Sequence, residues 1–203
     1  MKKVIYINSG HSTSDSGAVA YGKKESELCM MLRGKLAEFL DKQFTVFCVP
    51  DRYNLQGSIE WVNERTSSLE DGLAFSIHLN AGGGTGAESF YYGSGDPKSQ
   101  KIAQTIVDKY CELTGYYNRG AKPDTSARAG RLGWIRDTVP WATLIECCFI
   151  DSESDMASFD VNLIAYAMYC GICDVYQVSP IIEEDKEAIK KQIFALIEKL
   201  ANK

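Results

Sequence analysis

Residues 73–80 read Leu-Ala-Phe-Ser-Ile-His-Leu-Asn, a short and mainly apolar run that carries one histidine near its end. A run of this length, followed by glycines at 82–84, is typical of a buried β-strand that leads into a loop. We therefore predict a strand that brings His78 to the place where the chain leaves the core.

Similar segments recur along the chain and alternate with helical patterns. The predicted strands occupy residues 4–8, 45–49, 73–80, 88–92, 132–137 and 142–150. The predicted helices, which show helical periodicity or capping signals, occupy residues 25–41, 58–69, 97–114 and 153–176. This alternation predicts an α/β fold with a mostly parallel, mixed and twisted sheet that has helices on both faces.

Composition narrows the class of protein. The chain has 203 residues, 45% hydrophobic and 24% charged, which predicts a globular domain that needs no disulfide or structural metal to fold. The net charge of −5 includes no basic block, which disfavours nucleic-acid binding. No run of about 18 apolar residues is present, so no membrane insertion is expected. The seven cysteines lie mostly in apolar patterns, as reduced core thiols do.

The N-terminus differs from a secretory signal. Lys2 and Lys3 are followed by only a few apolar residues before the polar Asn8, Ser9 and His11. A signal peptide needs a longer apolar core. We therefore expect synthesis in the cytoplasm without a signal peptide.

Both histidines of the chain, His11 and His78, lie where predicted strands end. Ligands bind at the carboxyl ends of strands in open α/β sheets, so the two imidazoles are expected at one edge. Glu25, at the start of the next helix, would complete the two-histidine, one-carboxylate set of many catalytic zinc sites. Alternatively, the histidines are ordinary polar residues and Glu25 only complements the helix dipole, with Glu27 competing for either role.

Glu146 is an acid within an otherwise apolar predicted strand. An ionised carboxylate there costs several kcal/mol unless it is paired, so its presence needs a reason. One reason is catalysis, because a buried carboxylate can serve as a general base and then as a general acid. The other is a structural ion pair with a residue such as Arg136 or Arg119.

Together these residues resemble the zinc-dependent N-acetylmuramoyl-L-alanine amidases of the amidase-3 family, in the form of a phage or prophage endolysin-like catalytic domain. The resemblance runs from about Lys3 to Tyr176. It rests on Ile-Asn-Ser-Gly-His11, Asp15-Ser-Gly-Ala18, Glu25, Ser76-Ile-His-Leu-Asn-Ala81, Gly86-Ala-Glu88, Asn118-Arg-Gly120 and the segment from Pro140 to Ile150. Ser16 stands where the family usually has proline, which affects the shape of the loop.

The resemblance implies a zinc ion held by His11, Glu25 and His78, with Glu146 as the catalytic acid or base. The implied reaction is hydrolysis of the amide between N-acetylmuramic acid and L-alanine in bacterial peptidoglycan, for host-cell or cell-wall lysis after release from the cell. The fourteen-residue interval from His11 matches Glu25 rather than Glu27 to the family's ligand. Asn80 and Arg119 lie in matching motifs and could orient the glycan or the peptide.

The resemblance leaves the end of the chain uncovered. Residues 1–178 are assigned to the catalytic domain and 179–203 to a linker and an amphipathic helix over about 183–201. The apolar stripe of that helix would pack on the catalytic domain, on a second copy of the chain, or on a wall-binding domain further along.

The sequence is also compatible with two rival classes of function. A cysteine-dependent hydrolase would use His78 with a thiol, and Cys148 is predicted to share a strand face with Glu146, opposite to Cys147. A non-catalytic wall-binding module would keep the concave edge without needing Glu146.

Overall fold

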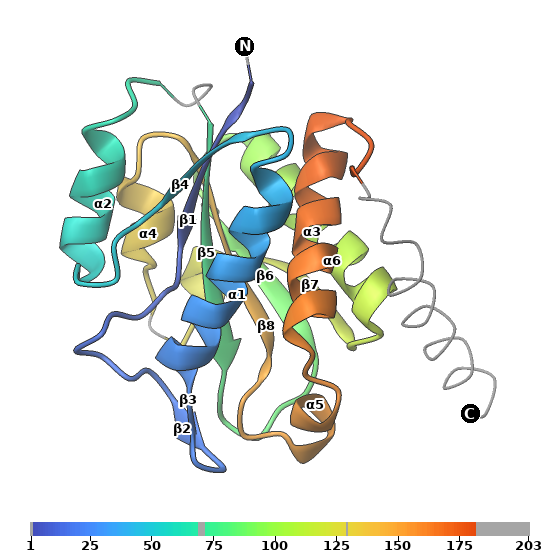
Figure 1. Ribbon diagram of the computed structural model, residues 1–203. Coiled ribbons are helices and arrows are strands. Elements are labelled where there is room, and N and C mark those ends of the chain that lie inside the picture. Colours follow the sequence, from blue (N-terminus) through green and yellow to red (C-terminus); the bar gives the residue numbers. More distant parts are fainter. Residues whose placement is uncertain (1, 69–71, 129, 182–203) are drawn as a thin grey trace.

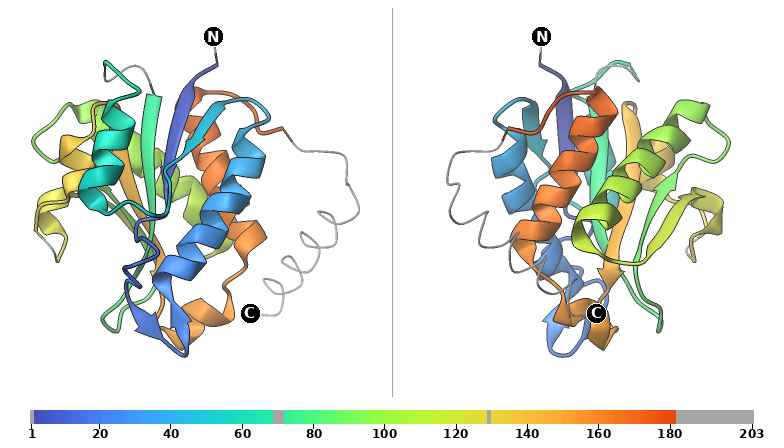
Figure 2. Two further views of the ribbon diagram at one scale, coloured as in Figure 1. Left: turned by 60° about the vertical axis from the view of Figure 1, so that its left-hand side comes forward. Right: turned by 90° about the vertical axis from the view of Figure 1, so that its right-hand side faces the viewer.

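The computed structural model describes residues 2–68, 72–128 and 130–181, which form one twisted sheet between helical layers (Figures 1 and 2). The sheet order is β4-β1-β5-β8-β6-β7. Its strands are β1 (Val4–Asn8), β4 (Thr45–Cys48), β5 (Gly72–Asn80), β6 (Ala87–Tyr91), β7 (Asn118–Pro123) and β8 (Trp141–Phe149).

Four neighbouring strands, β4, β1, β5 and β8, are parallel, whereas β6 runs antiparallel to β8 and β7 runs parallel to β6. The predicted fold class, a mostly parallel and mixed sheet with helices on both faces, is confirmed. One consequence is that β1, β5 and β8 end where β6 and β7 begin. We call this side of the sheet the carboxyl edge.

Helices cover the two faces unequally (Figure 1). The larger core lies under α1 (Glu25–Leu40), α3 (Pro97–Thr114) and α6 (Val161–Tyr176), and the smaller core lies under α2 (Leu55–Asn63) and α4 (Gly133–Asp137). Side chains alternate between the faces of a strand, so Ile5 and Ile7 enter the larger core while Tyr6 enters the smaller one. The sheet is therefore buried on both sides over most of its length.

Helix ends follow the capping signals where these exist. Asp96 caps α3, Pro97 is its first residue, and Gly115 ends it with φ of 76°. The predicted helix over 58–69 is corrected to 55–63, because the side chain of Asn54 accepts a hydrogen bond from Gly57 N and starts the helix earlier.

Three other predicted elements are wrong. Residues 133–137 form helix α4 instead of a strand, with the adjacent Trp134 and Ile135 both buried; a short apolar run does not distinguish the two structures. Residues 118–123, interpreted as a loop, form the edge strand β7, whose polar side chains hide the strand pattern. The last helix is two helices, α5 (Glu153–Ala157) and α6, because Asp160 caps the second.

A small hairpin of β2 (Val19–Ala20) and β3 (Lys23–Lys24) was not predicted. Its turn is Tyr21-Gly22, both with positive φ, which is the conformation that two-residue hairpins favour. The hairpin leads directly into α1.

Cys147 and Cys148 do not lie on opposite faces. The register between β5 and β8 shifts after His78–Glu146, so that Asn80 pairs with Phe149. This β-bulge puts one extra residue into β8, and both thiols pack into the larger core. All seven cysteines are free, and Cys48 alone is exposed.

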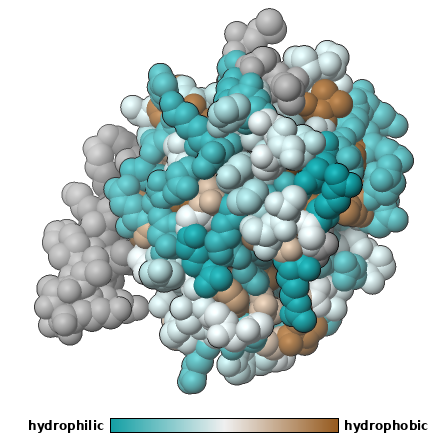
Figure 3. Space-filling model, turned by 180° about the vertical axis from the view of Figure 1, so that it is seen from behind, coloured by the Kyte–Doolittle hydropathy of each residue, from teal (hydrophilic) through white to brown (hydrophobic). Residues whose placement is uncertain are grey.

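On the face in Figure 3, hydrophilic residues predominate and hydrophobic ones are scattered. No helix in the described ranges is both long and apolar enough to cross a membrane. The helix predicted over 183–201 lies outside the described residues.

Candidate metal centre

Three titratable side chains from three elements meet at the carboxyl edge. His11 lies in the loop after β1, His78 lies near the end of β5, and Glu25 is the first residue of α1. Oε1 of Glu25 is 3.0 Å from Nε2 of His11 and 3.1 Å from Nδ1 of His78. One candidate ligand atom from each of the three lies within 4.8 Å of the others. Glu27 instead is exposed and pairs with Lys24.

Glu25 is held by its surroundings as a buried anion. Besides the two imidazoles, its carboxylate accepts hydrogen bonds from Leu79 N at 3.1 Å and Ala18 N at 2.9 Å. Burial alone would raise the pKa of Glu25, but the hydrogen bonds with His11 and His78 outweigh burial and hold the pKa well below its usual range. A desolvated carboxylate facing two imidazoles is an arrangement that a cation would complete.

The pKa of His11 is shifted in the opposite direction to that of Glu25. Burial would lower its pKa, but the hydrogen bond and the charge of Glu25, with a further contribution from Asp15, raise it to about 9. Oδ2 of Asp15 lies 2.9 Å from Nδ1 of His11, on the side of the ring away from Glu25. Metal-binding histidines commonly have such a carboxylate behind them, because it fixes the tautomer and the ring orientation.

Gly10 and Gly17 leave room for the side chains of the cluster. A Cβ on Gly10 would lie 2.6 Å from the ring of His78, and a Cβ on Gly17 would lie 2.6 Å from Oε2 of Glu25. Both glycines have positive φ, 75° and 61°, which other residues adopt only with strain. The backbone is therefore wrapped tightly around the cluster.

The loop that carries His11 is tied to the rest of the fold by Asp51. Arg33 on α1 forms a paired ion bridge with Asp51, whose carboxylate also accepts a hydrogen bond from Ser9 at 3.0 Å. The backbone oxygen of Asp51 accepts from Thr13 N at 3.0 Å. These contacts hold the chain on both sides of His11.

Glu146 lies directly beside this cluster, because it pairs with His78 in the register of β5 and β8. Its Oε2 is buried and has no hydrogen-bond partner among the described residues. The two arginines considered as partners are engaged elsewhere, Arg136 with Asp124 and Arg119 with Glu88. Burial raises the pKa of Glu146 to about 7, with His78 opposing the shift and the charge of Glu25 adding to it. A structural ion pair is therefore not its role.

The sequence does not mark Glu88 as a site residue. It pairs with Glu146 in the register of β6 and β8, so His78, Glu146 and Glu88 form one row across three strands. Asn80 and Arg119 both contact Glu88, with Asn80 Nδ2 at 2.9 Å and Arg119 Nε at 2.6 Å. The signal that would have found Glu88 is the one used for Glu146, an acid within a short apolar strand.

The thiols near the site are unsuited to nucleophilic attack. Burial raises the pKa of Cys148 to about 12 and that of Cys147 well above its ordinary value. Both side chains are therefore neutral at physiological pH, and the thiolate is the nucleophilic form.

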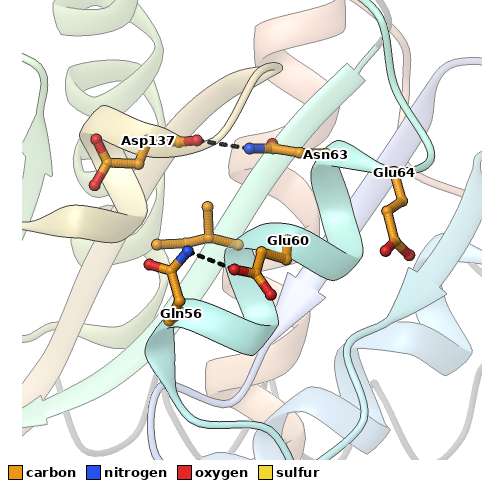
Figure 4. A pocket seen from close by; sticks show the side chains of 6 residues that line it. Gln56, Glu60, Asn63, Glu64 and Asp137 are labelled. Carbon is orange, nitrogen blue, oxygen red and sulfur yellow. Dashed lines mark hydrogen bonds between the residues drawn. The ribbon is translucent and has the colours of Figure 1, made fainter.

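A separate hollow lies between α2 and α4, away from the carboxyl edge (Figure 4). It has a volume of about 490 Å³. Its lining residues are Gln56, Ile59, Glu60, Asn63, Glu64 and Asp137. None of the residues in the His11–Glu25–His78 cluster contributes to it.

Comparisons with known proteins show the family to which the chain belongs. The model of the family described as N-acetylmuramoyl-L-alanine amidase matches residues 5–174. The chain is 29% identical to an endolysin of Bacillus phage SPP1 over 168 residues, covering 77% of this chain and 58% of that protein. It is 30% identical to a sporulation-specific N-acetylmuramoyl-L-alanine amidase of Bacillus subtilis, covering 74% and 58%. The chain thus spans little more than half the length of these relatives.

Solved structures share the fold. An N-acetylmuramoyl-L-alanine amidase from Clostridium difficile 630 superposes with a TM-score of 0.75 at 23% identity, covering 87% of this chain and 97% of the other. The catalytic domain of an endolysin targeting Clostridia difficile superposes with a TM-score of 0.67 at 26% identity, covering 86% and 98%. Since the family match extends over most of its length, this chain belongs to the N-acetylmuramoyl-L-alanine amidase family known as amidase 3.

Proposed function

We propose that this chain hydrolyses the amide between the lactyl group of N-acetylmuramic acid and L-alanine in bacterial peptidoglycan. The observation that carries the proposal is the convergence of His11 and His78 on one oxygen of the buried Glu25, with Glu146 alongside. Membership of the amidase family supplies the bond and the substrate class.

We further propose that the resident metal is zinc, held by His11, Glu25 and His78. Two imidazoles and one carboxylate are a common ligand set of catalytic zinc ions. The donor chemistry fits, because the carboxylate is already ionised and two ring nitrogens face its Oε1. When bound there, zinc would polarise the amide carbonyl and acidify a water molecule.

The remaining proton transfers fall to Glu146. Its unpartnered Oε2 can accept the proton of the attacking water, and the same oxygen can then return that proton to the L-alanine nitrogen as the amide bond breaks. Asn80 on β5 and Arg119 on β7 would orient the substrate along the carboxyl edge. The rival cysteine mechanism is disfavoured, because burial raises the pKa of both Cys147 and Cys148 and keeps their thiols protonated.

The test combines metal analysis with product identification. The purified, zinc-reconstituted chain should hold one zinc ion and should release new L-alanine amino termini from purified peptidoglycan, read by mass spectrometry of the fragments. Reducing sugar ends as the main product would indicate a glycosidase instead. Cleavage without any bound metal would remove the zinc mechanism.

We infer that the biological role is lysis of the bacterial cell wall, in the manner implied by the endolysin relative. The helix expected over 183–201 would serve self-association, docking or a link to a wall-binding domain. Light scattering of the full chain and of a chain ending at Val178 tests this, since self-association through this segment requires the shorter chain to be the smaller assembly.

A further inference from the structure

A second charged cluster lies beside the candidate metal centre and is not needed for metal binding. The carboxylate of Glu88 accepts hydrogen bonds from Asn80 on one oxygen and from both Arg119 and Lys122 on the other. Burial would raise the pKa of Glu88, but Lys122 and Arg119 lower it, so the group is ionised. Two cations against one anion leave the cluster with a net charge of about +1.

A local irregularity of β7 brings the two cations together. Residues three apart in a regular strand point to opposite faces. Here Ala87 pairs with Asn118 but Ser89 pairs with Ala121, so β7 contains an extra residue between these pairs. Gly120 lies in this bulge with φ of 77°. The bulge therefore allows both Arg119 and Lys122 to reach Glu88 on one face of the sheet.

Both cations keep donors for a further partner. Arg119 uses Nε for Glu88 and Nη1 for the backbone oxygen of Thr85, and its guanidinium lies over the ring of Phe149 at 5.0 Å. Within the described ranges its Nη2 has no partner, and Lys122 uses one of three N–H groups. Their side chains are 30% and 33% exposed, so solvent or substrate can reach them.

We propose that Arg119 and Lys122 bind a carboxylate on the peptide part of the substrate, and that Glu88 fixes their positions. This inference rests on the proposed amidase function. The lactyl carboxyl group is consumed in the scissile amide and the sugars are otherwise uncharged, so the charge that an N–H cluster could select lies on the peptide. The cluster is also suitably placed, because Glu88 is one strand beyond Glu146 in the row that contains His78.

The proposal makes Lys122 a specificity-determining residue that can be tested without disturbing the metal. Two synthetic substrates are compared, N-acetylmuramoyl-L-alanyl-glutamate and its counterpart with both glutamate carboxyl groups converted to carboxamides. The wild-type chain should prefer the carboxylate substrate in kcat/KM by about tenfold or more, as expected for a charge-assisted hydrogen bond, and mainly through KM.

Lys122→Gln should reduce this preference towards one, while Lys122→Arg should keep most of it. Glu88 retains Asn80 and Arg119 in the glutamine variant, so the buried acid stays partnered. Lys109→Gln is the matched control, since Lys109 is a similarly exposed lysine paired with Glu112 and Asp174 on the helical side. Its preference should equal that of the wild type.

The outcomes separate this inference from the function beneath it. If the wild type cleaves neither substrate, the amidase proposal itself fails. If it cleaves both with equal kcat/KM, the amidase proposal stands and carboxylate recognition is overturned. A full preference retained in Lys122→Gln, or an equal loss in Lys109→Gln, also overturns the assignment to Lys122.

Discussion

The hollow between α2 and α4 and the cluster at the carboxyl edge differ in almost every respect. The hollow is roomy and lined by acids and amides that bond to one another or face water: Gln56 donates to Glu60 at 2.7 Å and Asn63 donates to the backbone oxygen of Asp137 at 2.7 Å (Figure 4). At the carboxyl edge, the buried carboxylate of Glu25 lies within hydrogen-bond distance of two imidazoles. The backbone there leaves no space for a Cβ at Gly10 or Gly17.

The difference shows that a large concavity is a weak guide to chemistry in this molecule. The hollow carries no desolvation cost, because each of its polar groups is either hydrogen-bonded locally or exposed to solvent. The cluster brings together groups that are costly to desolvate, and two backbone positions there are open only to glycine. Costly arrangements of this kind concentrate at functional sites.

The largest expected effect comes from removing a ligand. His78→Ala should abolish both metal binding and activity, because only two of the three proposed donors remain. Elemental analysis should fall from one metal per chain to near zero, with the thermal transition still cooperative. A variant that keeps its metal and its turnover would show that His78 is not a ligand.

Glu146→Gln should separate chemistry from metal binding. The amide fills the same space but cannot accept a proton, so kcat should fall by about 10² to 10⁴ with the metal content unchanged. Loss of metal together with activity would make Glu146 a ligand instead. Turnover near that of the wild type would assign the base to another group.

Asp15→Asn should weaken metal binding, although Asp15 contacts His11 and is not itself a proposed ligand. The orienting charge behind His11 is lost, and metal affinity should fall by about tenfold to a hundredfold. A competition titration with a chelator measures this. Glu27→Gln, which removes an exposed acid paired with Lys24, is the control and should bind metal as the wild type does.

Gly17→Ala tests how tightly the backbone encloses the cluster. Gly22→Ala is the matched control, since Gly22 also has positive φ, 72°, but a Cβ there meets nothing within 4 Å. Both should lose about 1–2 kcal/mol from backbone strain. Gly17→Ala should lose more, and should also bind metal more weakly, because its methyl group overlaps Glu25 and His11. Equal losses in the two variants would contradict a tight enclosure.

The smallest effect is expected in the hollow. Glu60→Gln keeps the hydrogen-bond capacity at an exposed helix position, so stability should change by less than about 0.5 kcal/mol and turnover by less than twofold. Chemical denaturation and the peptidoglycan assay measure these. A large loss of activity would reverse the comparison and give the hollow a function.

The sequence was informative where one physical requirement dominated. Buried strands such as β1 and β5 must be apolar, and the histidines stand out against that background, His11 just after β1 and His78 near the end of β5. The edge strand β7 and the helix α4 were mistaken because an edge strand need not be apolar and a five-residue helix has no period. The bulges in β7 and β8 depend on cross-strand register, which no local pattern reports. For that reason the shared position of Arg119 and Lys122 could not be predicted.

The length of the loop between His11 and Glu25 determines how much metal binding would stabilise the chain. Its ends, fourteen residues apart, meet at one carboxylate oxygen, and His78 joins them from fifty-three residues beyond Glu25. A metal at this junction would act as a cross-link, and closing a loop of this length costs roughly 2 kcal/mol of chain entropy plus a constant. Metal binding to the native state alone also adds about 4 kcal/mol at a thousand times Kd. If a metal binds here, chelation should therefore release this loop to proteases before the sheet unfolds, and the metal would protect the chain as well as serve its chemistry.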